Sequence, residues 1–150
     1  MAIVRTAGTE IIRTAMFEAV NETEQKLIVG EQHHIYTVLS ITICCLASNT
    51  PGTNIMYFRL KGYDSKGGTT AQEHHIFRWT MVANETFVWN DKFSFNGHEP
   101  TDFAGPMDDV TKQNAIADQG SSVAQFMACS ATHASDDCDI IITYIDQNNA

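Results

Sequence analysis

The sequence has few basic residues. Nine Lys and Arg stand against 18 Asp and Glu in 150 residues, which gives a formal net charge of −9. Proteins that bind DNA, RNA or anionic lipid neutralise phosphate groups with a basic surface. The composition therefore argues against nucleic acid and membranes as partners. An acidic excess favours solubility and suits the outer surface of a large assembly.

Long apolar segments are also absent. Arg5, Glu10 and Arg13 interrupt the first 20 residues, so this region lacks the continuous apolar stretch of a secretion signal. The longest apolar stretch, residues 36–47, is shorter than the ~18–20 residues that a membrane helix requires. We therefore expect a chain that folds in the cytoplasm, without secretion or a membrane anchor.

The four cysteines lack the spacing of a disulfide framework or a zinc site. Cys44 and Cys45 are adjacent, where a disulfide would be strained, and Cys129 and Cys138 follow far away without a CxxC pattern. We predict buried free thiols that pack as small hydrophobic residues.

Motifs of known catalytic chemistry are missing too. The chain has no GxSxG motif, P-loop, glycine-rich dinucleotide fingerprint or local Cys-His signature. Pairs of carboxylates are common in any acidic chain, so they do not indicate hydrolysis. We predict that the protein is not an enzyme, and assign no catalytic residue, cofactor-binding residue or cofactor.

Two groups of residues keep a metal site open as an alternative. The histidine pairs at 33–34 and 74–75 cannot each chelate one ion alone, because consecutive strand residues face opposite sides. Asp136, Asp137 and Asp139 offer oxygen ligands for calcium but lack EF-hand spacing. Turn and capping roles explain these carboxylates equally well, and we predict no metal.

Along much of the chain, apolar residues alternate with other residues. This period of two residues is typical of strands. Over 34–47 the pattern predicts one strand, and we assign to its core face Ile35, Thr37, Leu39, Ile41, Ile43, Cys45 and Ala47. Pro51 and Gly52 favour a turn, after which residues 56–61 alternate again. We interpret this second strand as the hairpin partner of the first.

Further strands are predicted at residues 73–81, 122–132 and 138–147. The stretch TFVWNDKFSFNG, residues 86–97, reads as two strands with a turn at Asn90 and Asp91, or as one bent strand. Residues 98–121 are polar and predict a long loop that could contain a short helix.

About eight strands at hairpin spacing predict an all-β fold, an antiparallel β-sandwich resembling a jelly roll. We expect one globular domain of the usual size, with a sandwich over residues 33–150 and an N-terminal extension or edge strands over 1–32. Short apolar patches in that extension could form an arm that contacts a partner: Ile3, Val4, Ile11 and Ile12.

Several aromatic residues could stack on sugars: Trp79, Trp89, Phe87, Tyr57 and Tyr63. Aromatic residues that alternate with β-branched residues more often pack against each other. We therefore predict that core or interface packing involves the following residues: Trp79, Phe87, Trp89, Phe93, Phe95, Leu39, Ile41, Ile43, Ile140 and Ile142.

The order of these segments resembles a known family. The chain resembles small virion structural proteins of tailed bacteriophages, especially cyanophage-like myoviruses. The resemblance lies in the order of HHIYTVLSITICC, a polar turn, ETFVWNDKFSFNG and the final DIIITYIDQ. The resemblance covers residues 33–147 and carries no catalytic signature. It implies a virion protein that decorates or cements the head as a homo-oligomer, with a trimer favoured, on the major capsid protein or other virion proteins. Alternatives are a tail, neck or baseplate component and a receptor-facing carbohydrate-binding module.

Overall fold

The computed structural model describes residues 8–64, 69–98 and 123–148, which form nine strands. None of these residues belongs to a helix long and apolar enough to cross a membrane. The strands are β1 (Thr9–Val20), β2 (Gln25–Val29), β3 (His34–Ala47), β4 (Ile55–Asp64), β5 (Thr69–Thr80), β6 (Thr86–Trp89), β7 (Phe93–Asn96), β8 (Phe126–Ser130) and β9 (Asp137–Asn148).

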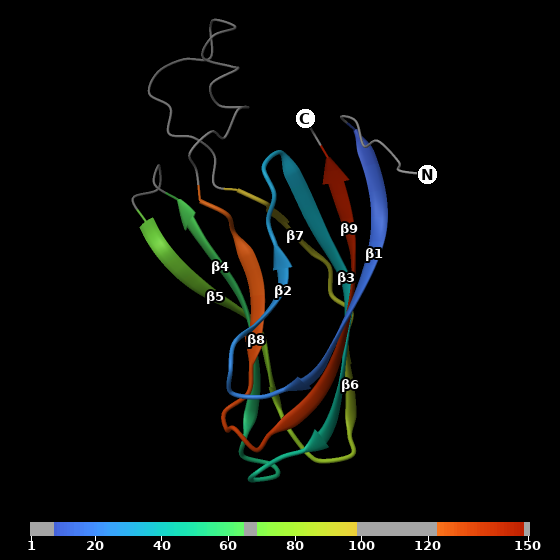
Figure 1. Ribbon diagram of the computed structural model, residues 1–150, viewed down its shortest axis with the longest axis vertical. Coiled ribbons are helices and arrows are strands. Elements are labelled where there is room, and N and C mark those ends of the chain that lie inside the picture. Colours follow the sequence, from blue (N-terminus) through green and yellow to red (C-terminus); the bar gives the residue numbers. More distant parts are fainter. Residues whose placement is uncertain (1–7, 65–68, 99–122, 149–150) are drawn as a thin grey trace, which may run out of the picture.

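The strands form two antiparallel sheets that pack face to face (Figure 1). Sheet 1 has the order β1-β9-β3-β6, with β7 also paired to β3, and sheet 2 has the order β2-β8-β4-β5. Most successive strands therefore alternate between the sheets, which is the arrangement of a jelly roll. The predicted all-β sandwich is confirmed.

The predicted hairpin between residues 34–47 and 56–61 is wrong. β3 is flanked on both sides, by β9 and by β6 and β7, so it has no free edge for β4. The segment from 48 to 54 instead carries the chain from sheet 1 to sheet 2. The strand that pairs with β4 as a hairpin is β5.

The predicted core face of β3 is correct only for its second half. Tyr36 and Val38 are buried, and after a register shift opposite β9 the buried residues are Ile41, Ile43 and Cys45. A β-bulge inserts one residue and moves every following side chain to the other face. Ile35, Thr37 and Leu39 therefore lie outside the core, and Ala47, beyond a second shift, is exposed.

The stretch TFVWNDKFSFNG forms one interrupted strand, the second of the two predicted forms. β6 pairs with Ile41–Cys44 and β7 with Ile35–Val38, so both lie along the same side of β3. The interruption at residues 90–92 lies opposite the bulge of β3. A strand that follows a bulged neighbour must adjust its own register at the same point.

Aromatic rings join the two sheets along the edges formed by β5 and by β6 and β7. The ring of Phe77 stacks on Phe58 at 4.4 Å and on Trp89 at 5.3 Å between centroids, and Trp79 stacks on Phe87 at 5.8 Å. Such offset pairs add about 0.5–1.5 kcal/mol each beyond the burial of their area. The aromatic stretch therefore closes one side of the sandwich.

A backbone ladder joins the two sheets at one end. Gly30 N donates to Gln125 O at 2.9 Å, Gln125 N to Gly97 O at 2.8 Å, and Gly97 N to His34 O at 2.8 Å. The chains approach so closely that a methyl group at Gly97 would overlap the carbonyl oxygen of Glu31. Glycine at this position is therefore a requirement of packing.

The N-terminal region contributes one edge strand to each sheet, since β1 pairs with β9 and β2 with β8. Of the predicted arm, Ile3 and Val4 lie outside the described residues, Ile11 is half-buried and Ile12 is 71% exposed. The predicted loop, apart from His98, also lies outside the described residues.

Candidate functional site: the neutral outer face of sheet 1

The outward side chains of sheet 1 form three rows that cross neighbouring strands. The first row consists of Ile12, Ile145, Thr37 and Ser94. The second consists of Thr14, Thr143 and Ser40. The third consists of Met16, Ile141, Thr42 and Val88. We call these eleven residues the neutral face. None of them carries a charge, although 18% of the chain is charged.

Large apolar side chains are exposed on the neutral face. Met16 is 73% exposed, Val88 52% and Ile141 41%. Hydroxyl pairs lie among them, with Thr14 and Thr143 at 3.4 Å and Thr37 and Ser94 at 2.8 Å between their oxygen atoms. A surface of apolar and hydroxyl side chains without charges matches the centre of protein interfaces, where charged residues are depleted.

Acidic residues lie beyond the ends of the neutral face. Glu10 precedes its first row on β1 and is exposed, while Glu18 on β1 and Asp139 on β9 lie beyond its last row. Glu18 is exposed and Asp139 is half-buried. Carboxylates therefore bound the uncharged area at both ends on β1 and at one end on β9, as charged residues do at the rim of an interface.

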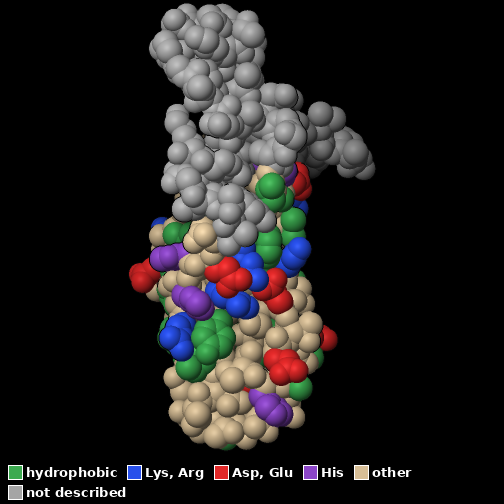
Figure 2. All heavy atoms as spheres, turned by 90° about the vertical axis from the view of Figure 1, so that its left-hand side faces the viewer, with side chains coloured by type: hydrophobic (Ala, Val, Ile, Leu, Met, Phe, Trp, Pro, Cys, Tyr) green, Lys and Arg blue, Asp and Glu red, His purple; other side chains and the backbone are tan. Residues whose placement is uncertain are grey.

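The outer face of sheet 2 has the opposite character. Lys61 Nζ pairs with Glu73 Oε1 at 2.9 Å and with Glu24, while Arg59 lies 3.5 Å from each of the same two carboxylates. Arg59 also donates to Ser130 Oγ at 2.6 Å. Figure 2 views the molecule from this side and shows basic and acidic side chains gathered at its middle. We call this the charged face.

The ion pairs shift the pKa values of their members. Burial opposes the charged form of Lys61, but hydrogen bonds to Glu24 and Glu73 outweigh it and raise the pKa of Lys61. The hydrogen bond from Lys61 lowers the pKa of Glu73, against a smaller effect of burial. Lys61 and Glu73 are therefore both held in their charged forms.

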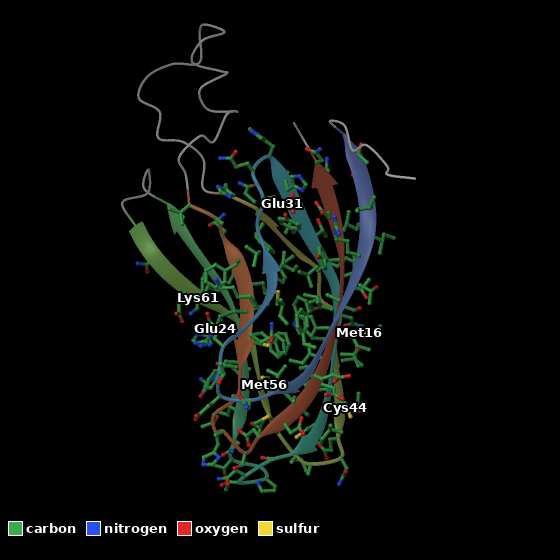
Figure 3. All side chains as sticks on the ribbon, viewed as in Figure 1. Met16, Glu24, Glu31, Cys44, Met56 and Lys61 are labelled. Carbon is green, nitrogen blue, oxygen red and sulfur yellow. The ribbon has the colours of Figure 1, made fainter. Side chains whose placement is uncertain are left out.

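The two faces differ in what each can bind. Met16 and Cys44 lie on the side of sheet 1, and Lys61 and Glu24 lie on the opposite side, with Met56 between the sheets (Figure 3). On the charged face Arg59 and Lys61 are already paired with neighbouring carboxylates. The polar groups of the neutral face are uncharged hydroxyls, so covering it with a partner requires little desolvation of charge.

The residues predicted for core or interface packing lie mostly inside the sandwich. Ile41, Ile43, Ile140 and Ile142 are fully buried, and Phe95 is 7% exposed. Half-buried aromatic side chains pack against this core from β5, β6 and β7: Trp79, Phe87, Trp89 and Phe93. Leu39 lies at the bulge and is half-buried outside the core.

Of the aromatic residues considered for sugar stacking, Tyr57 is on the charged face, and the side chain of Tyr63 lies outside the described residues. The ring of Tyr57 lies 5.1 Å from the guanidinium carbon of Arg78 and 5.7 Å from the ring of His75. The aromatic residues of the stretch ETFVWNDKFSFNG pack against the core instead.

Asp136, one of the candidate metal ligands, is occupied by other partners. Asp136 is buried and accepts hydrogen bonds from Asn49 N at 2.8 Å, Asn54 Nδ2 at 2.8 Å and His133 N at 2.9 Å. His34 and the pair His74 and His75 are on different sheets. Within the described part of the chain, no group of three His, Cys, Asp or Glu residues could hold a metal ion.

Sequence reasoning missed a buried carboxylate at the end of sheet 1. Asp146 is 2% exposed and pairs with Arg13 Nε at 2.8 Å and His34 Nδ1 at 2.7 Å. Burial raises the pKa of the neighbouring Tyr36 to about 12. Alternation alone placed Asp146 on the side of Ile140 and Ile142, but its partners lie more than 100 residues away.

No protein-family model matches this chain, and no curated protein matches it. Among solved structures, the chain is similar to one described under "Bacillus endospore appendages form a novel family of disulfide-linked pili". The match has 7% sequence identity and a TM-score of 0.43, and covers 100% of this chain and 97% of that chain. Identity and TM-score are too low to extend any property of those pili to this protein.

Proposed function

We propose that this chain is a non-enzymatic structural subunit that binds other proteins through the neutral face, and specifically a decoration or cement protein on the head of a tailed phage. The observation that carries the binding role is an uncharged, partly apolar sheet face on a protein with a net charge of −9. The assignment to a phage head comes from the resemblance in residues 33–147.

The size of the neutral face indicates how it would be used. Five residues along β1 and four strands across span about 16 Å by 19 Å, or roughly 300 Å², at the usual strand spacings. One partner in a standard interface buries about 800 Å². The neutral face therefore suits the uncharged centre of a larger contact, with a rim from neighbouring segments.

Cementing follows from this arrangement if neighbouring capsid subunits, or other copies of this chain, cover the face. Opening the shell would then expose apolar area to water, which costs about 25 cal/mol per Å². We propose a homo-oligomer, with a trimer favoured, seated on the major capsid protein, and with the charged face toward solvent.

The binding role is tested by adding a charge to the neutral face. Met16→Glu places a carboxylate at a residue that is 73% exposed, so we expect the variant to fold as the unaltered protein does. We expect affinity for particles stripped of this protein to fall at least about tenfold, because a charge at the centre of an interface costs more than about 1.4 kcal/mol.

Val29→Glu is the matched control. Val29 is 55% exposed on an edge strand of sheet 2 and receives the same change in charge. The control variant should bind as the unaltered protein does. Equal binding by all three proteins would contradict the proposed surface, and unchanged heat resistance of stripped particles would contradict cementing. Antibody labelling only at the tail would replace the head assignment with a tail component.

A further inference from the structure

Two cysteines that are 93 positions apart face each other across sheet 1. Cys45 on β3 is the direct register partner of Cys138 on β9. Both side chains are 0% exposed, so both point into the sandwich. Both are free thiols in this structure.

The backbone hydrogen bonds of Cys45 show which kind of pair this is. Its N–H donates to Glu85 O at 2.9 Å and its carbonyl accepts from Asn84 N at 2.7 Å. Both groups therefore point toward the segment before β6 and away from β9. Opposed residues that exchange no hydrogen bonds have Cα atoms about 4.5 Å apart, the closest spacing in an antiparallel sheet. A disulfide needs about 4.4–6.8 Å.

The surroundings favour this pair over the other cysteines. Cys138 Sγ donates to Met81 Sδ at 3.5 Å, and Cys45 Sγ donates to Ala47 O at 3.6 Å, so both sulfur atoms have only weak partners. Cys44 is half-buried on the outward side of β3, and Cys129 belongs to sheet 2. Neither has a cysteine opposite it.

We propose that Cys45 and Cys138 are an oxidisable pair that forms a cross-strand disulfide between β3 and β9. With oxidised glutathione as the oxidant, one thiolate forms a mixed disulfide and releases one glutathione thiol. The second cysteine then attacks that mixed disulfide and releases the other. The protein loses two protons and two electrons, and the glutathione disulfide gains them.

Burial determines when this reaction can occur. Burial raises the pKa of both thiols, which leaves little thiolate in the closed sandwich. Oxidation is therefore expected during folding, or when the sheet end opens, and slowly in the folded protein. The bond would tie together the two central strands of sheet 1. The inference does not depend on the proposed function.

The test is to refold the protein in a glutathione buffer, alkylate the free thiols, and map the cysteines by mass spectrometry without reduction. We expect two of the four cysteines to be alkylated and the peptides of Cys45 and Cys138 to be joined. Cys44→Ser with Cys129→Ala keeps only the proposed pair, and its unfolding midpoint should be at least about 5 °C higher when oxidised than when reduced.

Two results would overturn the proposal. One is a refolded, native chain in which all four cysteines remain alkylated, and the other is a bridge that maps to Cys44 or Cys129. Cys138→Ala should keep three alkylated cysteines. The same mapping on protein folded in an oxidising bacterial periplasm gives a second measurement that does not require refolding, and reduced cysteines at 45 and 138 there would count equally against the pair.

Discussion

Asp136 shows how one buried carboxylate can hold several turns. Its two oxygens accept hydrogen bonds from Asn49, Asn54 and His133, which belong to the turns after β3 and before β9. The crossing from sheet 1 to sheet 2 therefore depends on a residue 82 positions from Asn54. Of the two roles that the sequence left open for Asp136, the structure shows turn capping.

Asp136→Ala should lower the free energy of unfolding by about 3 kcal/mol, because it leaves buried donors without a partner. Urea unfolding measures the change. Asp139→Ala is the control, since Asp139 accepts one exposed hydrogen bond, from Ala19 N at 3.2 Å, and should cost less than about 1 kcal/mol. Equal losses in the two variants would contradict a special role for Asp136.

The Lys61–Glu73 pair gives a pH dependence of known sign. Lys61 lowers the pKa of Glu73 in the folded chain. The pair therefore stabilises the fold at pH values above the pKa of Glu73 in the unfolded chain, and this stability is lost as the pH falls through its pKa in the folded chain. The effect is small because the side chain of Glu73 is 42% exposed and solvent screens the pair.

Glu73→Gln should therefore cost less than about 1 kcal/mol at neutral pH. The difference between the two proteins should begin to shrink as the pH falls below the ordinary Glu pKa of about 4.3. It should vanish only below the lowered pKa of Glu73 in the folded chain, where both side chains are neutral. Denaturant unfolding at a series of pH values measures this. A difference that grows with acid would mean that the pair does not stabilise the fold.

At the scale of the strands, periodicity predicted most of the elements and missed how they connect. Residues 34–38 and 41–45 each alternate clearly, but a bulge between them exchanges the faces. No residue at 39 or 40 marks the insertion. The turn around Pro51 and Gly52 was equally misleading, since a turn of this kind can join neighbours in one sheet or cross between two sheets.

The candidate site was hidden for the same reason. Each row of the neutral face combines residues from strands far apart in the sequence, such as Met16, Ile141 and Thr42. Alternation predicts which residues of one strand share a side. Only the strand order shows that several uncharged sides lie next to each other, and strand order depends on the long connections.

The close packing of Gly97, which follows β7, against the backbone of Glu31 leads to a prediction. Gly97→Ala should cost about 3 kcal/mol or more, because its methyl group meets the backbone of Glu31 and not a movable side chain. Gly52→Ala is the control. Gly52 has a φ of 76° and open space around it, so alanine there should cost only about 1 kcal/mol.

Thermal or urea unfolding separates the two glycine variants. A cost at Gly97 no larger than the cost at Gly52 would mean that the ladder from Gly30 to His34 can separate without loss of the fold. In that case the end of the sandwich would be held by side chains alone.

Across the whole molecule, the basic side chains are concentrated on one of the two faces. Four of the six Lys and Arg residues in the described part of the chain lie on the charged face: Lys26, Arg59, Lys61 and Arg78. The neutral face has neither sign. Because the chain as a whole is acidic, two copies repel each other at long range, whichever surface finally makes contact.

This repulsion gives the assembly a salt dependence. If copies associate through the neutral face, then contact itself involves no ion pairs, and the opposing term is repulsion between two chains with a net charge of −9. The Debye length falls from about 30 Å at 0.01 M salt to about 3 Å at 1 M. Self-association should therefore strengthen as salt is added.

Sedimentation equilibrium across that range measures the association constant, with Met16→Glu as the control. The variant should associate more weakly than the unaltered chain at every salt concentration, because its added carboxylate must be desolvated at the contact. Association that weakens with salt would mean that ion pairs hold the copies together. The charged face, with Arg59 and Lys61 between two carboxylates, would then be the contact, because screening weakens attractive ion pairs as it weakens repulsion.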